Sequence, residues 1–125
     1  MATDPLQSVT IPVAGTPAIR HRVNEVRGLI AKGQRRSAFV MAWSLLEATL
    51  RALDRDTASR PRSPGTVVQT LDMNGYIDPD TDRRMRDLIG LRSRIVHGDL
   101  DAEPTKADVE LLLSGVEEAL RPNAG

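Results

Sequence analysis

Apolar residues recur every three or four positions along most of the chain, which is the period of an amphipathic α-helix. Between residues 16 and 32 they form a single stripe, made of Ile19, Val23, Val26 and Ile30. Thr16 and Pro17 resemble a capping residue followed by a proline in the first helical turn, and Gly33 is a typical stop. The pattern therefore predicts a first helix from about residue 16 to residue 32.

The segment from Arg35 to Asp54 is the most apolar part of the chain. Large apolar residues form one stripe and smaller ones fill much of the rest of the helix: Phe39, Trp43, Leu46, Leu50 and Leu53, then Ala38, Met41, Ala42, Leu45, Ala48 and Ala52. A helix that is apolar most of the way round is either central in a bundle or shared with a second chain. Because 125 residues leave little room to bury one helix on every side, we expect a homodimer.

Three further helices are predicted from their start and stop signals. They are a short helix from Ser63-Pro64 to Asn74-Gly75, a long one from Asp78-Pro79 to about His97, and a last one from Thr105 to Pro122. Residues 1–15 contain two prolines and show no helical period, which indicates a flexible or extended arm. The sequence thus predicts an all-α protein: an up-and-down helical bundle of four main helices plus one short helix, in one domain from residue 16 to residue 122.

The amino-acid composition limits the kinds of catalytic and binding site that the chain can form. The chain has no cysteine, which excludes thiol nucleophiles and cysteine metal sites, and its two histidines lack metal-ligand spacing, so we expect neither metal nor cofactor. The net charge is zero, so any contact with nucleic acid has to be local. No apolar run approaches the roughly 18 residues of a membrane span, and no signal-peptide pattern is visible. We therefore expect a cytoplasmic protein without membrane contact.

The segment most suggestive of chemistry is Leu91-Arg92-Ser93-Arg94-Ile95-Val96-His97-Gly98, at the end of the predicted long helix. Histidine exchanges protons near neutral pH, and guanidinium groups bind phosphate. Arg92 and His97 are five residues apart, roughly 140° around an ideal helix, so they do not share a face. Arg94 and His97 are neighbours. Arginine and histidine also occur at helix ends simply because they satisfy the last carbonyl groups.

This segment resembles the signature of the HEPN superfamily (higher eukaryotes and prokaryotes nucleotide-binding domains). In that superfamily an Arg, four to six intervening residues and a His close the last long helix before a short final one, and Arg92 and His97 match that spacing. The order of helices is also similar, including the apolar second helix with the run from Ala42 to Glu47. The resemblance in helix order covers about residues 18 to 120, but the sequence motif that is specific to the superfamily covers eight residues.

The resemblance implies a function, a mechanism and partners. Active HEPN domains are metal-independent endoribonucleases in which two copies of the motif line one cleft of a symmetric dimer. Here it implies that the RNA 2′-hydroxyl attacks the adjacent phosphorus, with His97 transferring protons and Arg92 holding the phosphate. The two-chain cleft also accommodates two residues that do not share a face. Such an enzyme would be a toxin or a defence component, and a nucleotidyltransferase-like antitoxin would be one expected partner.

Three residues are expected to support this site. Many active members have Asn, Asp or His directly after the motif arginine, where this chain has Ser93, a poorer orienting group. Arg94 lies beside His97. Glu47 lies on an apolar stripe and needs a cationic partner, either Arg51 or an arginine of the motif helix, which it would then orient.

Two other interpretations stay open. One is a non-catalytic HEPN module that dimerises and binds a partner protein or a nucleotide. The other is an unrelated helical protein with a chance motif. Short basic clusters at residues 35–36, 60–62 and 83–86 would form a rim for RNA if the fold brought them together.

Overall fold

The computed structural model describes residues 11–54 and 61–121, and the regular structure of these residues is entirely helical. The helices are α2 (Thr16–Ala31), α3 (Arg35–Leu53), α4 (Pro64–Met73), α5 (Pro79–Arg86), α6 (Ile89–Val96) and α7 (Lys106–Leu120). Residues 11–15 precede the first helix without regular structure. The rest of the expected N-terminal arm, residues 1–10, lies outside the described residues.

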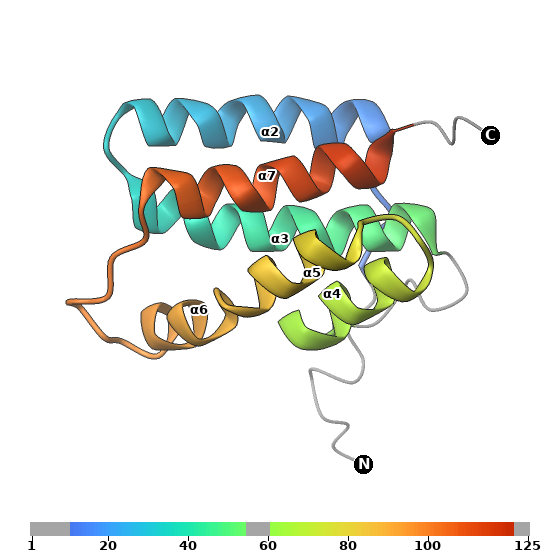
Figure 1. Cartoon of the computed structure of the whole chain (residues 1–125). Helices are drawn as coiled ribbons and strands as arrows, with labels where there is room; N and C mark the ends of the chain where they lie inside the picture. The colour runs from blue at the N-terminus through green and yellow to red at the C-terminus, as the bar shows by residue number, and fades with distance from the viewer. Residues whose placement is uncertain (1–10, 55–60, 122–125) are drawn as a thin grey trace, which may run out of the picture.

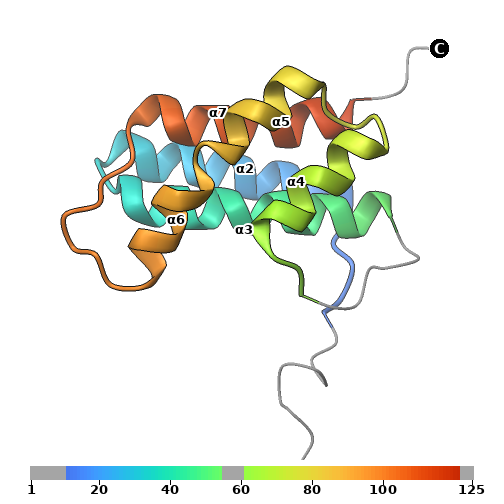
Figure 2. The same ribbon diagram turned by 60° about the horizontal axis from the view of Figure 1, so that its bottom comes forward.

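The three long helices, α2, α3 and α7, run side by side, and the shorter α4, α5 and α6 lie along one side of them (Figure 1). A second view shows α4 and α6 on the side of α3 away from α2 (Figure 2). Helix α3 packs against α2, α4, α6 and α7, so it is the central helix. Its apolar character is therefore explained by burial within one chain and is no longer an argument for a second one.

The core combines the predicted stripes of α2, α3 and α7. Its largest fully buried side chains are Phe39, Ile19, Leu46, Leu50, Leu71, Met85, Leu112 and Leu113. Phe39 and Trp43 lie next to each other on α3, with their ring centroids 6.4 Å apart. Trp43, a member of the predicted stripe of the second helix, is 5% exposed and belongs to this core. The structure thus confirms an all-helical bundle built on aliphatic residues.

The starts of α4 and α7 follow the capping chemistry of the sequence. The Ser63 side chain accepts a hydrogen bond from the Thr66 N–H at the start of α4, and Thr105 forms the predicted capping box with Asp108. The predicted Thr16 cap of α2 is wrong, because Gly15 is the N-cap and no side chain accepts a hydrogen bond there. Among the described residues three glycines have positive φ angles, namely Gly33 at 75°, Gly75 at 77° and Gly98 at 92°. These are the glycines at which the sequence predicted helix ends, because only glycine adopts this conformation without strain.

The predicted long helix from residue 78 to residue 97 is wrong as a single element. Residues 87 and 88 form a turn that separates α5 from α6, and the Leu88 N–H bonds to the Met85 carbonyl, three residues back, at 2.9 Å. This turn lets both Met85 and Leu88 enter the core. The residues that follow, Ile89 and Gly90, have low helix propensity, so they do little to keep the helix straight.

Candidate functional site

Helix α6 carries the candidate motif and ends as the sequence predicts. Its C-cap is His97, whose N–H bonds to the Ser93 carbonyl at 3.1 Å, and Gly98 follows with its positive φ. None of the eight α6 residues, all of which the structure describes, is fully buried. The His97 and Ser93 side chains are exposed. The motif thus occupies a short, shallowly packed helix at the edge of the bundle.

Arg94 is held by the loop that follows the helix. Its Nε donates a hydrogen bond to Asp99 Oδ2 at 2.8 Å, and Asp99 Oδ1 accepts one from the Asp101 N–H at 3.1 Å. The Arg94 hydrogen bond, followed by that of Asp101, lowers the pKa of the Asp99 carboxyl below its usual value. This contact fixes the turn around Gly98, so Arg94 acts on the geometry of the helix end next to His97.

Arg92 lies in a different environment. It is half-buried and lines a pocket of about 60 Å³ where α3, the start of α4 and α6 meet. The residues that line this pocket are Val40, Trp43, Ser44, Glu47, Arg62, Pro64, Val67 and Arg92. The Arg92 guanidinium makes no hydrogen bond or ion pair with any residue that the structure describes. It is a cation set into the protein surface without an anionic partner from that part of the chain.

Glu47 reaches this pocket from α3. Its Oε1 accepts a hydrogen bond from the Arg62 backbone N–H at 2.6 Å and lies 3.4 Å from Arg51 Nη2. Of the two kinds of partner expected for Glu47, the structure shows Arg51, one turn along the same helix. Within the described residues Glu47 makes no ion pair with Arg92 or Arg94. It lines the same pocket as Arg92 without binding its guanidinium group.

Two buried groups at this place lack hydrogen-bond partners in the described part of the chain. They are the indole Nε1 of Trp43, which is 5% exposed, and the Nε and Nη2 of Arg51, which is 6% exposed. Ser44, which also lines the Arg92 pocket, was not expected there from the sequence; Arg51 was expected only as a partner of Glu47, and Arg62 only as part of the basic cluster at 60–62. Val40, Trp43, Ser44, Glu47 and Arg51 follow the three-and-four spacing of one helix face, which is a signal that was available. No periodicity places Arg62, because it precedes α4 in a loop.

One chain does not bring the two motif residues together in one pocket. Arg92 lines the pocket against α3 and α4, whereas His97 is exposed at the helix end and does not line it. This agrees with the roughly 140° that separates positions five residues apart on an ideal helix. The two side chains therefore do not share the Arg92 pocket.

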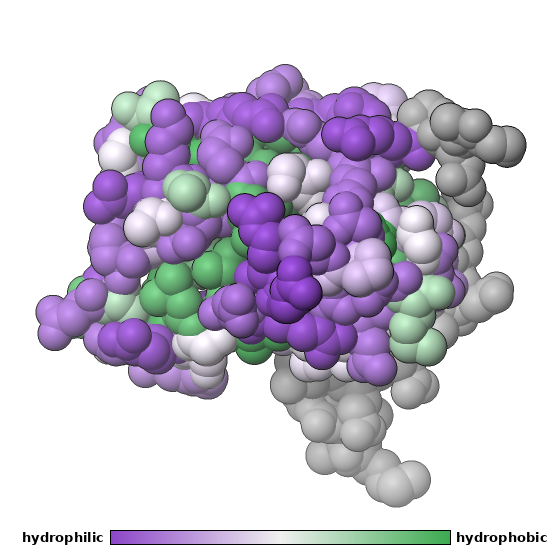
Figure 3. Space-filling model, in the orientation of Figure 1, coloured by the Kyte–Doolittle hydropathy of each residue, from purple (hydrophilic) through white to green (hydrophobic). Residues whose placement is uncertain are grey.

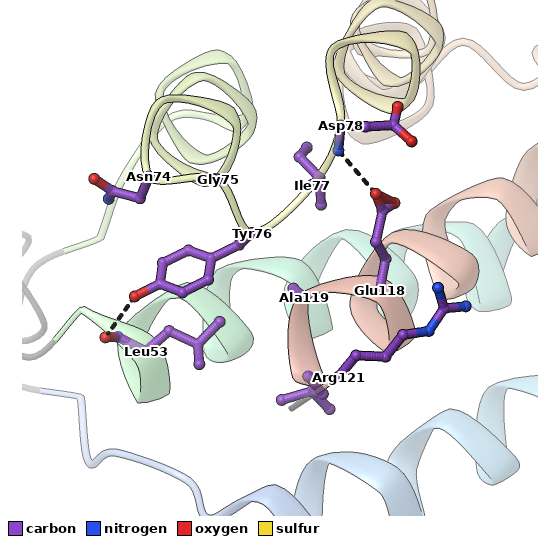
Figure 4. Close-up of a pocket in the computed structure, with 10 residues that line it drawn as sticks. Leu53, Asn74, Gly75, Tyr76, Ile77, Asp78, Glu118, Ala119 and Arg121 are labelled. Carbon is purple, nitrogen blue, oxygen red and sulfur yellow. Dashed lines mark hydrogen bonds between the residues drawn. The ribbon is translucent and has the colours of Figure 1, made fainter. Parts of the chain in front are cut away.

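A larger cavity, of about 540 Å³, lies at the other end of the bundle, between the end of α3, the turn after α4 and the end of α7 (Figure 4). Its polar groups are mostly used internally. The Tyr76 hydroxyl donates to the Leu53 carbonyl at 3.3 Å, and Glu118 accepts from the Asp78 N–H at 2.8 Å and from the Thr81 hydroxyl at 3.0 Å. The cavity shares no lining residue with the Arg92 pocket.

The basic clusters are largely neutralised by acidic neighbours. Glu103 pairs with Arg35 at 3.5 Å and with Arg36 at 3.2 Å. Within α5, Arg83 pairs with Asp80, and Arg86 pairs with Asp82. Residue 60 of the remaining cluster lies outside the described residues, and Arg62 lines the Arg92 pocket. Most arginines of the clusters at 35–36 and 83–86 are therefore paired, but Arg35 and Arg36 share one carboxylate, and Arg84 makes no ion pair with a described residue.

The described residues contain no group of three or more His, Cys, Asp or Glu side chains that could hold a metal ion. No helix among them combines the length and the apolar character needed to cross a membrane.

Comparison of the chain with models of protein families, with curated proteins and with solved structures gives no match. The proposed function of the chain is therefore inferred from the residues of α6 and the surfaces around them.

Proposed function

We propose that this chain is a dimeric, metal-independent endoribonuclease of the HEPN type, acting as a toxin or as a defence component. The observation that carries the proposal is that α6, which ends before Gly98, has an exposed His97 and an Arg92 guanidinium without a partner among the described residues. A guanidinium group binds phosphate oxygens, and an imidazole exchanges protons near neutral pH. RNA cleavage through its own 2′-hydroxyl needs these two groups and no metal.

The reaction conserves atoms without any external reagent. The 2′-oxygen forms a bond to the adjacent phosphorus, the bond from phosphorus to the 5′-oxygen breaks, and a 2′,3′-cyclic phosphate remains. His97 of one copy accepts the 2′-hydroxyl proton and then donates it to the departing 5′-oxygen, while the other copy supplies Arg92. Arg92 holds the non-bridging oxygens, where negative charge develops in the transition state.

The surface around α6 supports the docking of a second copy of the chain, which would complete the site. Polar side chains cover most of the face in Figure 3, but apolar side chains gather between α6 and α7. Val96, at the end of α6, is 42% exposed, and Leu100, in the following loop, is 78% exposed. Apolar side chains that remain exposed beside charged groups are common at protein interfaces. A two-fold arrangement through this surface sets two copies of the motif opposite each other.

The test is cleavage of RNA in the presence of EDTA, followed by identification of the fragment ends. We expect 2′,3′-cyclic phosphate ends from the wild type and a loss of at least a hundredfold in rate for Arg92→Ala and for His97→Ala. His21→Ala and Arg20→Ala are matched controls, because both side chains are exposed on α2, away from the motif. Cleavage that survives equally in the motif variants contradicts these roles. A stable dimer that cleaves no RNA would favour the non-catalytic HEPN module instead.

A further inference from the structure

The cavity of about 540 Å³ at the end of the bundle away from α6 has the size of a ligand site. Pockets for small organic molecules measure about 300–1,000 Å³. Figure 4 shows the Tyr76 ring lying between the turn after α4 and the end of α3. Apolar side chains form much of the wall, namely Leu53, Tyr76, Ile77, Ala119 and Leu120. An organic molecule with an apolar body therefore fits this cavity.

Three helices end at this cavity. Helix α3 ends at Leu53, α4 ends at Met73 and α7 ends at Leu120. Leu53, Asn74 and Leu120 line the cavity. The C-terminal end of a helix carries a partial negative charge of roughly one half, because its last carbonyl groups have no partner within the helix. Of the described helices that line the cavity, only α5 begins there, and the Asp78 side chain caps its positive end with a carboxylate. The helix ends thus make the cavity electronegative.

Two charged side chains near the end of α7, those of Glu118 and Arg121, also line the cavity. Glu118 is held in place, because its Oε1 accepts from the Asp78 N–H at 2.8 Å and its Oε2 accepts from the Thr81 hydroxyl at 3.0 Å. An ionised carboxylate has about four acceptor positions, so Glu118 can also accept from a ligand. Arg121 is exposed and makes no ion pair with a described residue, and it offsets part of the negative end of α7. The cavity therefore offers a fixed carboxylate, and its cation lies exposed.

Tyr76 gives the cavity two further groups that attract a cation. The face of a tyrosine ring is electron-rich and binds ammonium groups. The Tyr76 hydroxyl donates to the Leu53 carbonyl at 3.3 Å, and this carbonyl oxygen has a second lone pair for another donor. An anionic ligand would instead meet the Glu118 carboxylate and three negative helix ends. The charges therefore favour a cation with an apolar body.

We propose that the cavity between the ends of α3, α4 and α7 binds an organic cation, namely a protonated amine on an apolar body. The ammonium group pairs with Glu118, and the body lies against Tyr76 and Leu120. The cavity shares no lining residue with the Arg92 pocket, and none of its residues takes part in the proposed cleavage of RNA. It is a second site of the chain, and it does not depend on the proposed function.

Three probes of similar shape separate charge from apolar character: phenethylamine, which is protonated at pH 7, neutral phenethyl alcohol and anionic phenylpropanoate. Each is titrated into the full-length protein at constant ionic strength, and calorimetry gives its affinity. We expect saturable binding of the amine, at least about fivefold tighter than that of the alcohol, and the weakest binding for the anion. Amide NMR signals of Gly75, Tyr76 and Ala119 should shift with the amine, and that of Arg92 should not.

Glu118→Gln is the decisive variant. It removes the negative charge, so we expect the affinity for phenethylamine to fall about tenfold. Glu117→Gln is the matched control on the same helix, because the Glu117 carboxylate pairs with Arg27 at 2.7 Å and does not line the cavity. It should change the affinity less than about twofold. Arg121→Gln removes the competing cation and should raise the affinity about two- to threefold.

Glu118 also holds the start of α5, so thermal unfolding of each variant accompanies the titrations. A second pair of variants tests the ring without changing any charge. Tyr76→Phe keeps the aromatic face and should stay within about twofold of the wild type, whereas Tyr76→Leu should lose about threefold or more in affinity.

The contradicting outcomes are equally specific. Equal affinities for the amine and the alcohol, or tighter binding of phenylpropanoate, overturn the cation site. So do the absence of saturable amine binding, NMR shifts confined to residues outside the cavity, and equal losses in Glu118→Gln and Glu117→Gln. None of these titrations uses RNA. A negative result therefore leaves the proposed ribonuclease untouched, and a chain that cleaves no RNA but binds the amine keeps this cavity as a ligand site.

Discussion

Arg92 and His97 lie on the same short helix in opposite kinds of environment: Arg92 lines a pocket against α3 and α4, and His97 is exposed at the C-cap. The turn between α5 and α6 sets the position of this helix, and Gly98 sets its end. A phosphate held by Arg92 and a proton carried by His97 of the same chain therefore have no common pocket. This separation is the reason why the proposed chemistry requires two copies of the chain.

The end of α6 depends on the left-handed conformation of Gly98. Its φ angle is 92°, and a Cβ at this position meets no atom within 4 Å, so the cost of an added methyl group is conformational. We expect Gly98→Ala to lower the free energy of unfolding by about 1–2 kcal/mol. Gly28→Ala is the control: Gly28 lies inside α2 with equally open surroundings, and alanine there should stabilise by about 0.5–1 kcal/mol. Chemical denaturation measures both, and equal effects would contradict the assignment.

The turn after α6 should be sensitive to acid through Asp99. The Arg94 hydrogen bond lowers the pKa of Asp99 in the folded chain, so its stabilising contribution is present above the unfolded pKa of about 4 and is lost as the pH falls through the lower folded value. Asp99→Asn should therefore be less stable than the wild type at pH 7, and the difference should shrink below pH 4. Denaturation curves of the wild type and of Asp99→Asn across this pH range measure the difference, and a difference that stays constant would contradict the role of Asp99.

Asp72 should behave in the opposite sense. A hydrogen bond with Asp82 raises the pKa of Asp72, and the contact stabilises the fold only while Asp72 is protonated. This contribution is present below the unfolded pKa of about 4 and is lost as the pH rises through the folded value. Asp72→Asn should therefore stabilise the protein at pH 7 and leave it nearly unchanged at low pH. Asp82→Asn, which loses the Arg86 pair, should be destabilised at pH 7.

Glu47 and Arg51 are expected to depend on each other. Arg51 is buried, and Glu47 is its only ion-pair partner among the described residues. Glu47→Gln should cost about 1–3 kcal/mol, because it leaves a buried cation uncompensated. The double variant with Arg51→Met should recover most of that loss, because both charges are then absent. A double-mutant cycle from urea denaturation gives the coupling, and additive effects would show that the pair is not coupled.

The sequence alone predicts much of the fold, because helix caps and glycine stops are local signals. The Ser63 and Thr105 caps and the ends at Gly33, Gly75 and Gly98 follow from such chemistry. The break at residues 87–88 does not, because it depends on how Met85 and Leu88 reach a core formed by distant helices.

The candidate site likewise combines features that are set by the local sequence with features that are set by packing between helices. The sequence places Arg92 and His97 at the end of a helix, since both belong to one local segment. It does not place Arg62 beside Arg92, because that neighbourhood is created by the packing of α3, α4 and α6. The unpartnered indole N–H of Trp43 has the same origin, since burial and the absence of an acceptor are properties of the packed chain.

The central claim, a ribonuclease site shared between two copies, is tested most directly by mixing inactive variants. Arg92→Ala and His97→Ala chains carrying different affinity tags are co-expressed, and the heterodimer is isolated and incubated with RNA and EDTA. It retains one Arg92 and one His97, on different chains, so we expect about half of the wild-type rate, whereas either homodimeric variant is inactive. A heterodimer no more active than the two variants, beside an active wild type, would contradict the shared site.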